Sequence, residues 1–155
     1  MSILGSLVRV SPNLVEELRS PGADPYDVIS ELDTQIDLDR YWDVLRFLLD
    51  AVDVPINPMH SGRPYPNAED AWGHDRSSCL LTTDEVRQVS HFLEKTPFSE
   101  VAVHLKDATK VQLYPMNRQW NSELMFDRVK VSYDEMVELF REAARNGECI
   151  VYFAA

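Results

Sequence analysis

The 155-residue chain is long enough for a single hydrophobic core, and we predict one domain over residues 1–155. Fifteen Lys and Arg against 26 Asp and Glu leave a formal net charge of −11, which repels phosphate backbones and anionic head groups. Neither nucleic acid nor a membrane is therefore expected as a partner. The N-terminus lacks a secretory-signal pattern, and the two cysteines form no CxxC or metal-ligand pattern. We therefore expect a cytoplasmic protein without a cofactor.

The N-terminal part of the chain predicts a strand followed by two short helices. Residues 3–10 alternate in a way that suits a strand with both faces partly covered. Ser11 with Pro12, and Asp24 with Pro25, each combine an N-cap residue with a proline at the first helical position. Each pair is therefore expected to begin a short helix.

Residues 37–54, DLDRYWDVLRFLLDAVDV, predict a long helix that Asp37 caps. One broad apolar face is expected to join the core, and it consists of Leu38, Tyr41, Trp42, Leu45, Leu48, Leu49 and Val52. Four charged residues share a flank, namely Asp39, Asp43, Arg46 and Asp50. Phe47 lies on the far side, which predicts that another element of the chain or a partner packs against it.

Residues 53–79 form a proline-rich stretch without helical or strand periodicity, which predicts a long loop. Loops of this length in a compact domain usually carry function or move. Tyr65 and Trp72 within it are candidate aromatic anchors for a partner.

Most of the remaining chain is predicted to be helical. Thr82 and Glu85 form a capping box that begins a helix reaching about Lys95, and Thr96 with Pro97 begins another. Residues 111–116 are expected to be extended and residues 121–131 helical.

The C-terminal signals predict a helix and then a strand. Ser132 and Glu135 form a second capping box, Asn146 with Gly147 stops the helix, and residues 148–155 read as a strand. A strand at each end with helices between predicts an α+β fold in which both terminal strands lie in one small sheet packed with several helices.

No catalytic or metal site is predicted from the sequence. Cys79 and His74 are too loosely related to indicate a nucleophile–base pair. The donors of the loop have no diagnostic metal-ligand spacing, although their types suit zinc or manganese; they are His60, Glu69, Asp70, His74 and Asp75. The phosphate-binding glycine motifs are absent from the sequence.

Acidic charge gives the most informative signal. Residues 21–53 contain nine Asp and Glu against two Arg, so they carry seven of the eleven net negative charges. The simpler interpretation is a solubilising face, and the alternative is a docking surface for a basic protein. The candidate partner-binding residues are Asp37, Asp39, Asp43, Phe47, Asp50, Tyr65, Glu69, Asp70, Trp72 and Asp75.

The segments DLDRYWDVLRFLLD, LLTTDEV and VQLYPMNRQW, with the final helix and strand, resemble the YfbM-like family of small bacterial proteins along nearly the whole chain. The matching residues are Asp37, Asp39, Trp42, Asp43, Leu45, Phe47, Tyr114 and Pro115. In the loop HSGRPYPNAEDAWGHDRSSCLL, Gly73 and Arg76 match the family pattern, but prolines and acids replace much of the rest. The resemblance implies an α+β fold and no established reaction, so it supplies no catalytic residues.

Two functions remain open at this point. The first is a non-enzymatic binding protein, such as an immunity-type protein that blocks a toxin by covering its active site. The second is an enzyme or a small-ligand or metal-binding protein that uses the 53–79 loop as a lid, with His60, Trp72 and His74 at the site. On the first hypothesis, lysines at positions 39 and 43 weaken binding and leave the fold intact.

Overall fold

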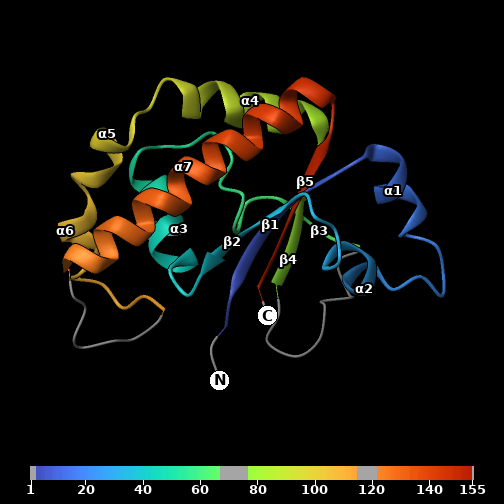
Figure 1. Ribbon diagram of the computed structural model, residues 1–155, viewed down its shortest axis with the longest axis horizontal. Helices are drawn as coiled ribbons and strands as arrows, with labels where there is room; N and C mark the ends of the chain where they lie inside the picture. Colours follow the sequence, from blue (N-terminus) through green and yellow to red (C-terminus); the bar gives the residue numbers. More distant parts are fainter. Residues whose placement is uncertain (1–2, 67–76, 115–121, 155) are drawn as a thin grey trace.

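The computed structural model describes residues 3–66, 77–114 and 122–154, and over these it shows one antiparallel sheet with helices on both faces (Figure 1). The five strands lie in the order β2-β1-β5-β4-β3 within this part of the chain. Their bounds are Gly5–Val10 (β1), Gln35–Asp39 (β2), Arg63–Pro64 (β3), Ser77–Leu81 (β4) and Cys149–Ala154 (β5). The two terminal strands pair at the centre of the sheet, which confirms the predicted α+β fold.

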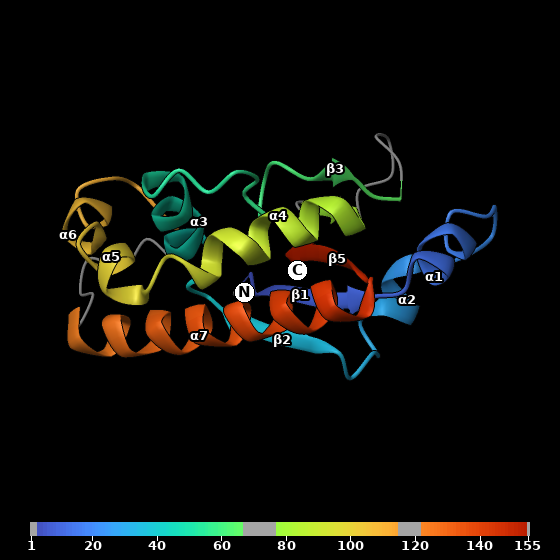
Figure 2. The ribbon, with the colours of Figure 1, turned by 90° about the horizontal axis from the view of Figure 1, so that it is seen from above.

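The helices divide between the two faces of the sheet (Figures 1 and 2). Their bounds are Pro12–Glu17 (α1), Pro25–Ile29 (α2), Trp42–Ala51 (α3), Thr83–Glu94 (α4), Phe98–Ala102 (α5), Leu105–Ala108 (α6) and Ser122–Asn146 (α7). The larger core lies between the sheet and helices α3 to α7, and the smaller one lies under α1 and α2. Because side chains alternate along a strand, Leu7 and Tyr152 enter the larger core while Val8 and Val151 enter the smaller.

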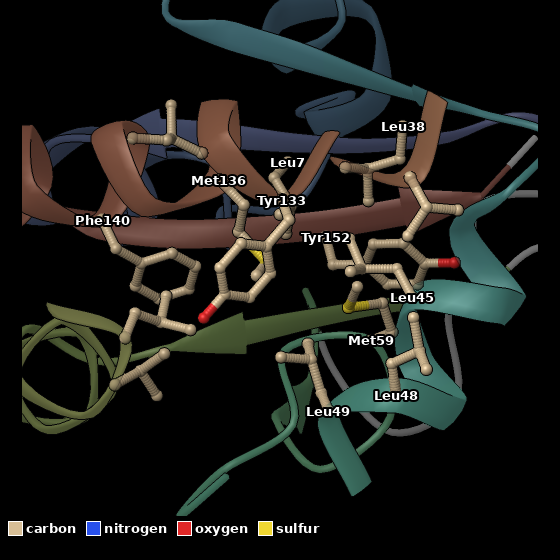
Figure 3. Close-up of a cluster of buried hydrophobic side chains, with 14 of the residues drawn as sticks. Leu7, Leu38, Leu45, Leu48, Leu49, Met59, Tyr133, Met136, Phe140 and Tyr152 are labelled. Atoms are coloured by element: carbon tan, nitrogen blue, oxygen red, sulfur yellow. The ribbon is translucent and has the colours of Figure 1, made fainter. Parts of the chain in front are cut away.

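The larger core holds α3 and α7 against the central strand. Figure 3 shows Tyr152 of β5 beside Leu45 of α3, with Tyr133 and Phe140 reaching in from α7. All four side chains are almost completely buried. Gly5 of β1 lets α3 approach the sheet, because a Cβ at this position would lie only 2.6 Å from the Cβ of Trp42.

Local capping signals are confirmed where the side chains make the expected hydrogen bonds. Ser11 accepts from the amide of Leu14, and Asp24 accepts from the amide of Asp27, both at 3.2 Å. Thr82 forms the capping box of α4. Gly147 adopts a left-handed φ of 65° directly after α7, where glycine carries no steric penalty.

The prediction that Asp37 caps a helix is wrong, because residues 35–39 form β2 and α3 begins only at Trp42. Asp39 has a positive φ of 54°, and its amide donates to Asp37 Oδ1 at 2.7 Å, so the chain turns here between strand and helix. The pairing of Ile36 with Leu7 of β1 is a tertiary interaction, and it competes with the helical pattern of the sequence.

Two further boundaries differ from the predictions. Ser132 does not cap a helix, since α7 runs unbroken through it and the serine is buried within the helix. Its buried neighbours Val129, Tyr133 and Met136 extend one apolar stripe across the expected break. The 53–79 segment is not wholly a loop either, because it contributes β3 and the start of β4.

Candidate functional site

The long helix α7 runs beside β2, the strand at one edge of the sheet (Figure 2). A groove lies between these two elements. It consists of two adjoining hollows of about 250 Å³ and about 260 Å³ that share Glu135. We call it the β2–α7 groove. Its lining residues include Arg9, Asp33, Asp37, Asp39, Tyr41, Arg128, Val131, Glu135, Glu138 and Glu142.

An edge strand and one side of a helix bring these side chains together. Residues 33–37 and 39, in and beside the edge strand β2, line one wall of the groove. Positions 128, 131, 135, 138 and 142 recur every three or four residues, so they share one side of α7. Because β2 and α7 contact one another, the two rows become the walls of one groove.

The groove is strongly acidic. Among the described residues that line it, six carry carboxylates and two carry guanidiniums. Arg9 already forms an ion pair with Glu148, with Nη1 and Oε1 separated by 2.6 Å. Three of the six carboxylates pair with arginines outside the lining, because Asp39, Glu138 and Glu142 contact Arg40, Arg141 and Arg145. The lining itself still carries more carboxylates than guanidiniums.

The carboxylates of Asp37 and Asp39 are held in place by the turn that follows β2. Asp37 accepts from the amide of Asp39, and Asp39 accepts from the amide of Arg40 at 2.8 Å. Val131 is 54% exposed and lines the same hollow as Tyr41. The groove thus offers both negative charge and an apolar contact point.

Asp43 does not belong to this acidic surface. Its residue is only 8% exposed, its Oδ1 accepts from Arg46 Nε at 2.5 Å, and its Oδ2 accepts from the Tyr114 amide at 2.8 Å. The prediction that Asp43 faces water or a partner is therefore wrong. A lysine there would place a buried ammonium beside Arg46, so the expectation that such a variant keeps its fold is also wrong.

Asp50 instead ties α3 to the segment that follows it. Asn57 Nδ2 donates to its Oδ1 at 2.9 Å, and His60 Nε2 lies 3.0 Å from both of its oxygens. Burial raises the pKa of Asp50, but the hydrogen bonds from Asn57 and His60 and the charges of His60 and Arg46 outweigh it, so the net pKa is lowered.

The same network includes a serine, which invites comparison with a hydrolytic triad. Ser61 Oγ lies 3.2 Å from His60 Nδ1, so Asp50, His60 and Ser61 form a chain of polar contacts. The side chains of His60 and Asp50 are 44% and 46% exposed. Hydrolytic triads work with a buried carboxylate and shielded oxyanion donors. The open position of Asp50 favours a structural role for this network.

The predicted aromatic contacts have internal partners. Phe47 is partly buried in the larger core, in a region where α5 and α6 contact α3. Tyr65 is fully buried, its hydroxyl donates to the carbonyl of Val15 at 2.9 Å, and burial raises its pKa to about 12. Tyr65 is therefore no accessible anchor. The remaining predicted residues lie outside the described residues, and they are Glu69, Asp70, Trp72 and Asp75.

Thiol and metal chemistry find little support in the described residues. Burial raises the pKa of the Cys79 thiol to about 11, and its Sγ donates to the carbonyl of Pro58 at 3.0 Å. Burial likewise raises the pKa of Cys149. Within the described ranges, no three His, Cys, Asp or Glu side chains are grouped to hold a metal ion. His74 lies outside those ranges.

The density of charge along the sequence does not single out the acidic residues of α7, whereas their helical spacing does. Glu135, Glu138 and Glu142 recur at intervals of three and four residues, so their shared side of α7 was predictable. Their position beside β2 was not, because it depends on how the helix packs on the sheet. No helix in the described part of the chain combines the length and apolar character needed to cross a membrane.

Comparisons with known proteins define the family. Over its full length, the fold is similar to the crystal structure of a protein of unknown function, YfbM from Escherichia coli. The TM-score is 0.70 at 17% sequence identity, and the match covers 98% of this chain and 99% of that chain. No protein among those with curated descriptions matches significantly. The family model described as Domain of unknown function (DUF1877) matches residues 1–153. The predicted YfbM-like relationship is thus confirmed, and the chain belongs to the DUF1877 family.

Proposed function

We propose that this chain is a non-enzymatic cytoplasmic binding protein that holds a basic protein in the β2–α7 groove. An immunity-type protein that covers the active site of a toxin is the most concrete form of this function. The observation that supports it best is the convergence of acids from two distant segments, Asp33 to Asp39 and Glu135 to Glu142, on one groove.

The physical basis is electrostatic attraction combined with a small apolar contact. Clustered carboxylates raise the association rate of a basic partner and select against acidic ones. Val131 and Tyr41 supply contact area within the acidic surroundings. The net charge of −11 acts in the same direction at longer range.

The partner is identified by cross-linking from within the groove. A photoreactive amino acid at Val131, introduced in the native cell, is expected to capture a basic protein. The same residue at Val28, which lies on the opposite face of the sheet in α2, is the control. If a basic protein is captured equally at both positions, or only at Val28, the groove is not its docking site.

Kinetics with the purified partner then test the role of the groove charge. The variant Glu135→Lys, Glu138→Lys is compared with Glu16→Lys, Glu17→Lys, which makes the same charge change at exposed positions on α1. At low salt we expect the groove variant to associate about tenfold more slowly and the control only about twofold. If both variants associate equally slowly, the slower association is explained by net charge alone, and docking in the groove is contradicted.

A further inference from the structure

A second groove lies on the other side of α7, where this helix packs against α4. The two helices lie side by side and run in opposite directions (Figure 2). The hollow between them has a volume of about 370 Å³. We call it the α4–α7 groove, and it is lined by Arg87, Ser90, His91, Glu94, Arg141, Ala144 and Arg145.

The side chains that line this groove are mostly cationic, although the chain as a whole is acidic. Three guanidiniums and one imidazole line it, against the carboxylate of Glu94 alone among the described lining residues. Positions 87, 90, 91 and 94 share one side of α4, and positions 141, 144 and 145 share one side of α7. Helical spacing therefore directs the cationic side chains toward the same space.

Each arginine also contacts a carboxylate. Arg87 pairs with Asp84, while Arg141 pairs with Glu138 at 2.6 Å and with Glu94 at 3.4 Å. Arg145 pairs with Glu142 at 3.1 Å. Exposed pairs within one helix contribute little net free energy, and a guanidinium has five N–H donors. The arginines therefore retain donors for an anion in the groove.

Ser90 adds a hydroxyl to the lining of the groove. The residue is only 5% exposed. A serine hydroxyl can donate one hydrogen bond and accept others. Ala144 also lines the hollow, and its short side chain leaves room beside the serine.

We propose that the α4–α7 groove binds a small polyphosphate anion, with the arginines around its oxygens and Ser90 as a hydrogen-bond donor. Guanidiniums pair with phosphate through two parallel N–H···O bonds, and two linked phosphate groups use several arginines at once. Apart from Ala144, the lining side chains are polar or charged, which favours a compact polar ligand over an apolar one. This site is independent of the proposed docking of a basic protein.

Pyrophosphate is the probe for this site, titrated into the isotope-labelled protein at constant ionic strength. Saturable shifts are expected at the backbone amides of Ser90, His91, Ala144 and Arg145. The variant Arg87→Gln, Arg145→Gln is expected to bind about tenfold or more weakly. Arg40→Gln, Arg63→Gln removes the same charge from exposed positions outside the groove and is expected to keep the wild-type affinity.

Ser90→Ala tests the hydroxyl without changing the net charge. A loss of about threefold to tenfold in pyrophosphate affinity is expected if the hydroxyl donates to the ligand. An unchanged affinity, or an equal loss in the two arginine variants, overturns the assignment. The assignment is also overturned if the wild-type protein binds poly-glutamate at this groove and shows no saturable response to pyrophosphate. The groove would then recognise acidic peptides.

Discussion

The two grooves beside α7 differ in charge although they share one helix. On the β2 side the helix presents Glu138 and Glu142, and on the α4 side it presents Arg141 and Arg145. The ion pairs Glu138–Arg141 and Glu142–Arg145 connect the two sides across the helix. Intrahelical pairs are usually read as small stabilising contacts. In α7, the three-residue spacing of these pairs also places the glutamates toward one groove and the arginines toward the other.

The largest expected difference is in stability, between a buried aspartate of α3 and an exposed aspartate of the β2–α7 groove. Asp43→Asn should lower the free energy of unfolding by about 1–3 kcal/mol, because the buried Asp43 would lose its charge-assisted hydrogen bond with Arg46. Asp37→Asn should change it by less than about 0.5 kcal/mol, since Asp37 is exposed in the groove. Urea unfolding of both variants measures the difference. Equal effects would mean that the two aspartates do not differ in role.

Exchanging the two charged residues of one ion pair on α7 should change the charge of both grooves at once. Glu142→Arg, Arg145→Glu keeps the net charge and the spacing of the pair, but exchanges which groove receives which charge. We expect about a tenfold loss of pyrophosphate affinity and a slower association with the basic partner. Calorimetry and stopped-flow measurements follow the two effects.

The matched control is a swap of Lys130 and Asp134, an exposed ion pair on α7 outside both sets of lining residues. Lys130→Asp, Asp134→Lys should leave both binding reactions unchanged. If it weakens them as much as the first swap, the assignment of charges to separate sides of α7 is wrong.

The smallest expected effect is on the pH dependence of stability, and it comes from Asp50, which lies in neither groove. Because its pKa is lower in the folded state, Asp50 stabilises the fold at pH values above its ordinary pKa of 3.8, and this contribution is lost as the pH falls through the lower folded value. Asp50→Asn should therefore be less stable than wild type at pH 5 and closer to it at pH 2. A constant difference across this range would show that the charge of Asp50 does not contribute.

Local signals allowed part of the fold to be predicted. The caps at Ser11, Asp24 and Thr82 and the stop at Gly147 depend on residues within a few positions, so they are readable from the sequence. β2 has only Ile36 and Leu38 as inward-facing apolar residues, and its pairing with β1 overrides a helical pattern that begins nearby. That outcome depends on tertiary structure.

The candidate site was also only partly predictable from the sequence. Asp37 and Asp39 were predicted to bind a partner, and they do line the acidic groove. Asp43 and Asp50 lie in the same stretch of sequence, but Asp43 accepts from the Tyr114 amide and Asp50 accepts from Asn57, and neither lines the groove. Charge counts along the chain cannot separate these two groups, because the separation depends on the turn at Asp39 that shifts the start of α3.

The salt dependence of partner association tests the central claim most directly. The association rate constant of the cross-linked partner is measured at several ionic strengths for wild type and for Glu135→Lys, Glu138→Lys. If the β2–α7 groove attracts the partner, the wild-type rate falls steeply with salt, the variant's rate falls less, and the two converge at high salt. If the association rate constants of wild type and variant fall equally steeply with ionic strength, the account is contradicted, because the groove carboxylates would then take no part in attracting the partner.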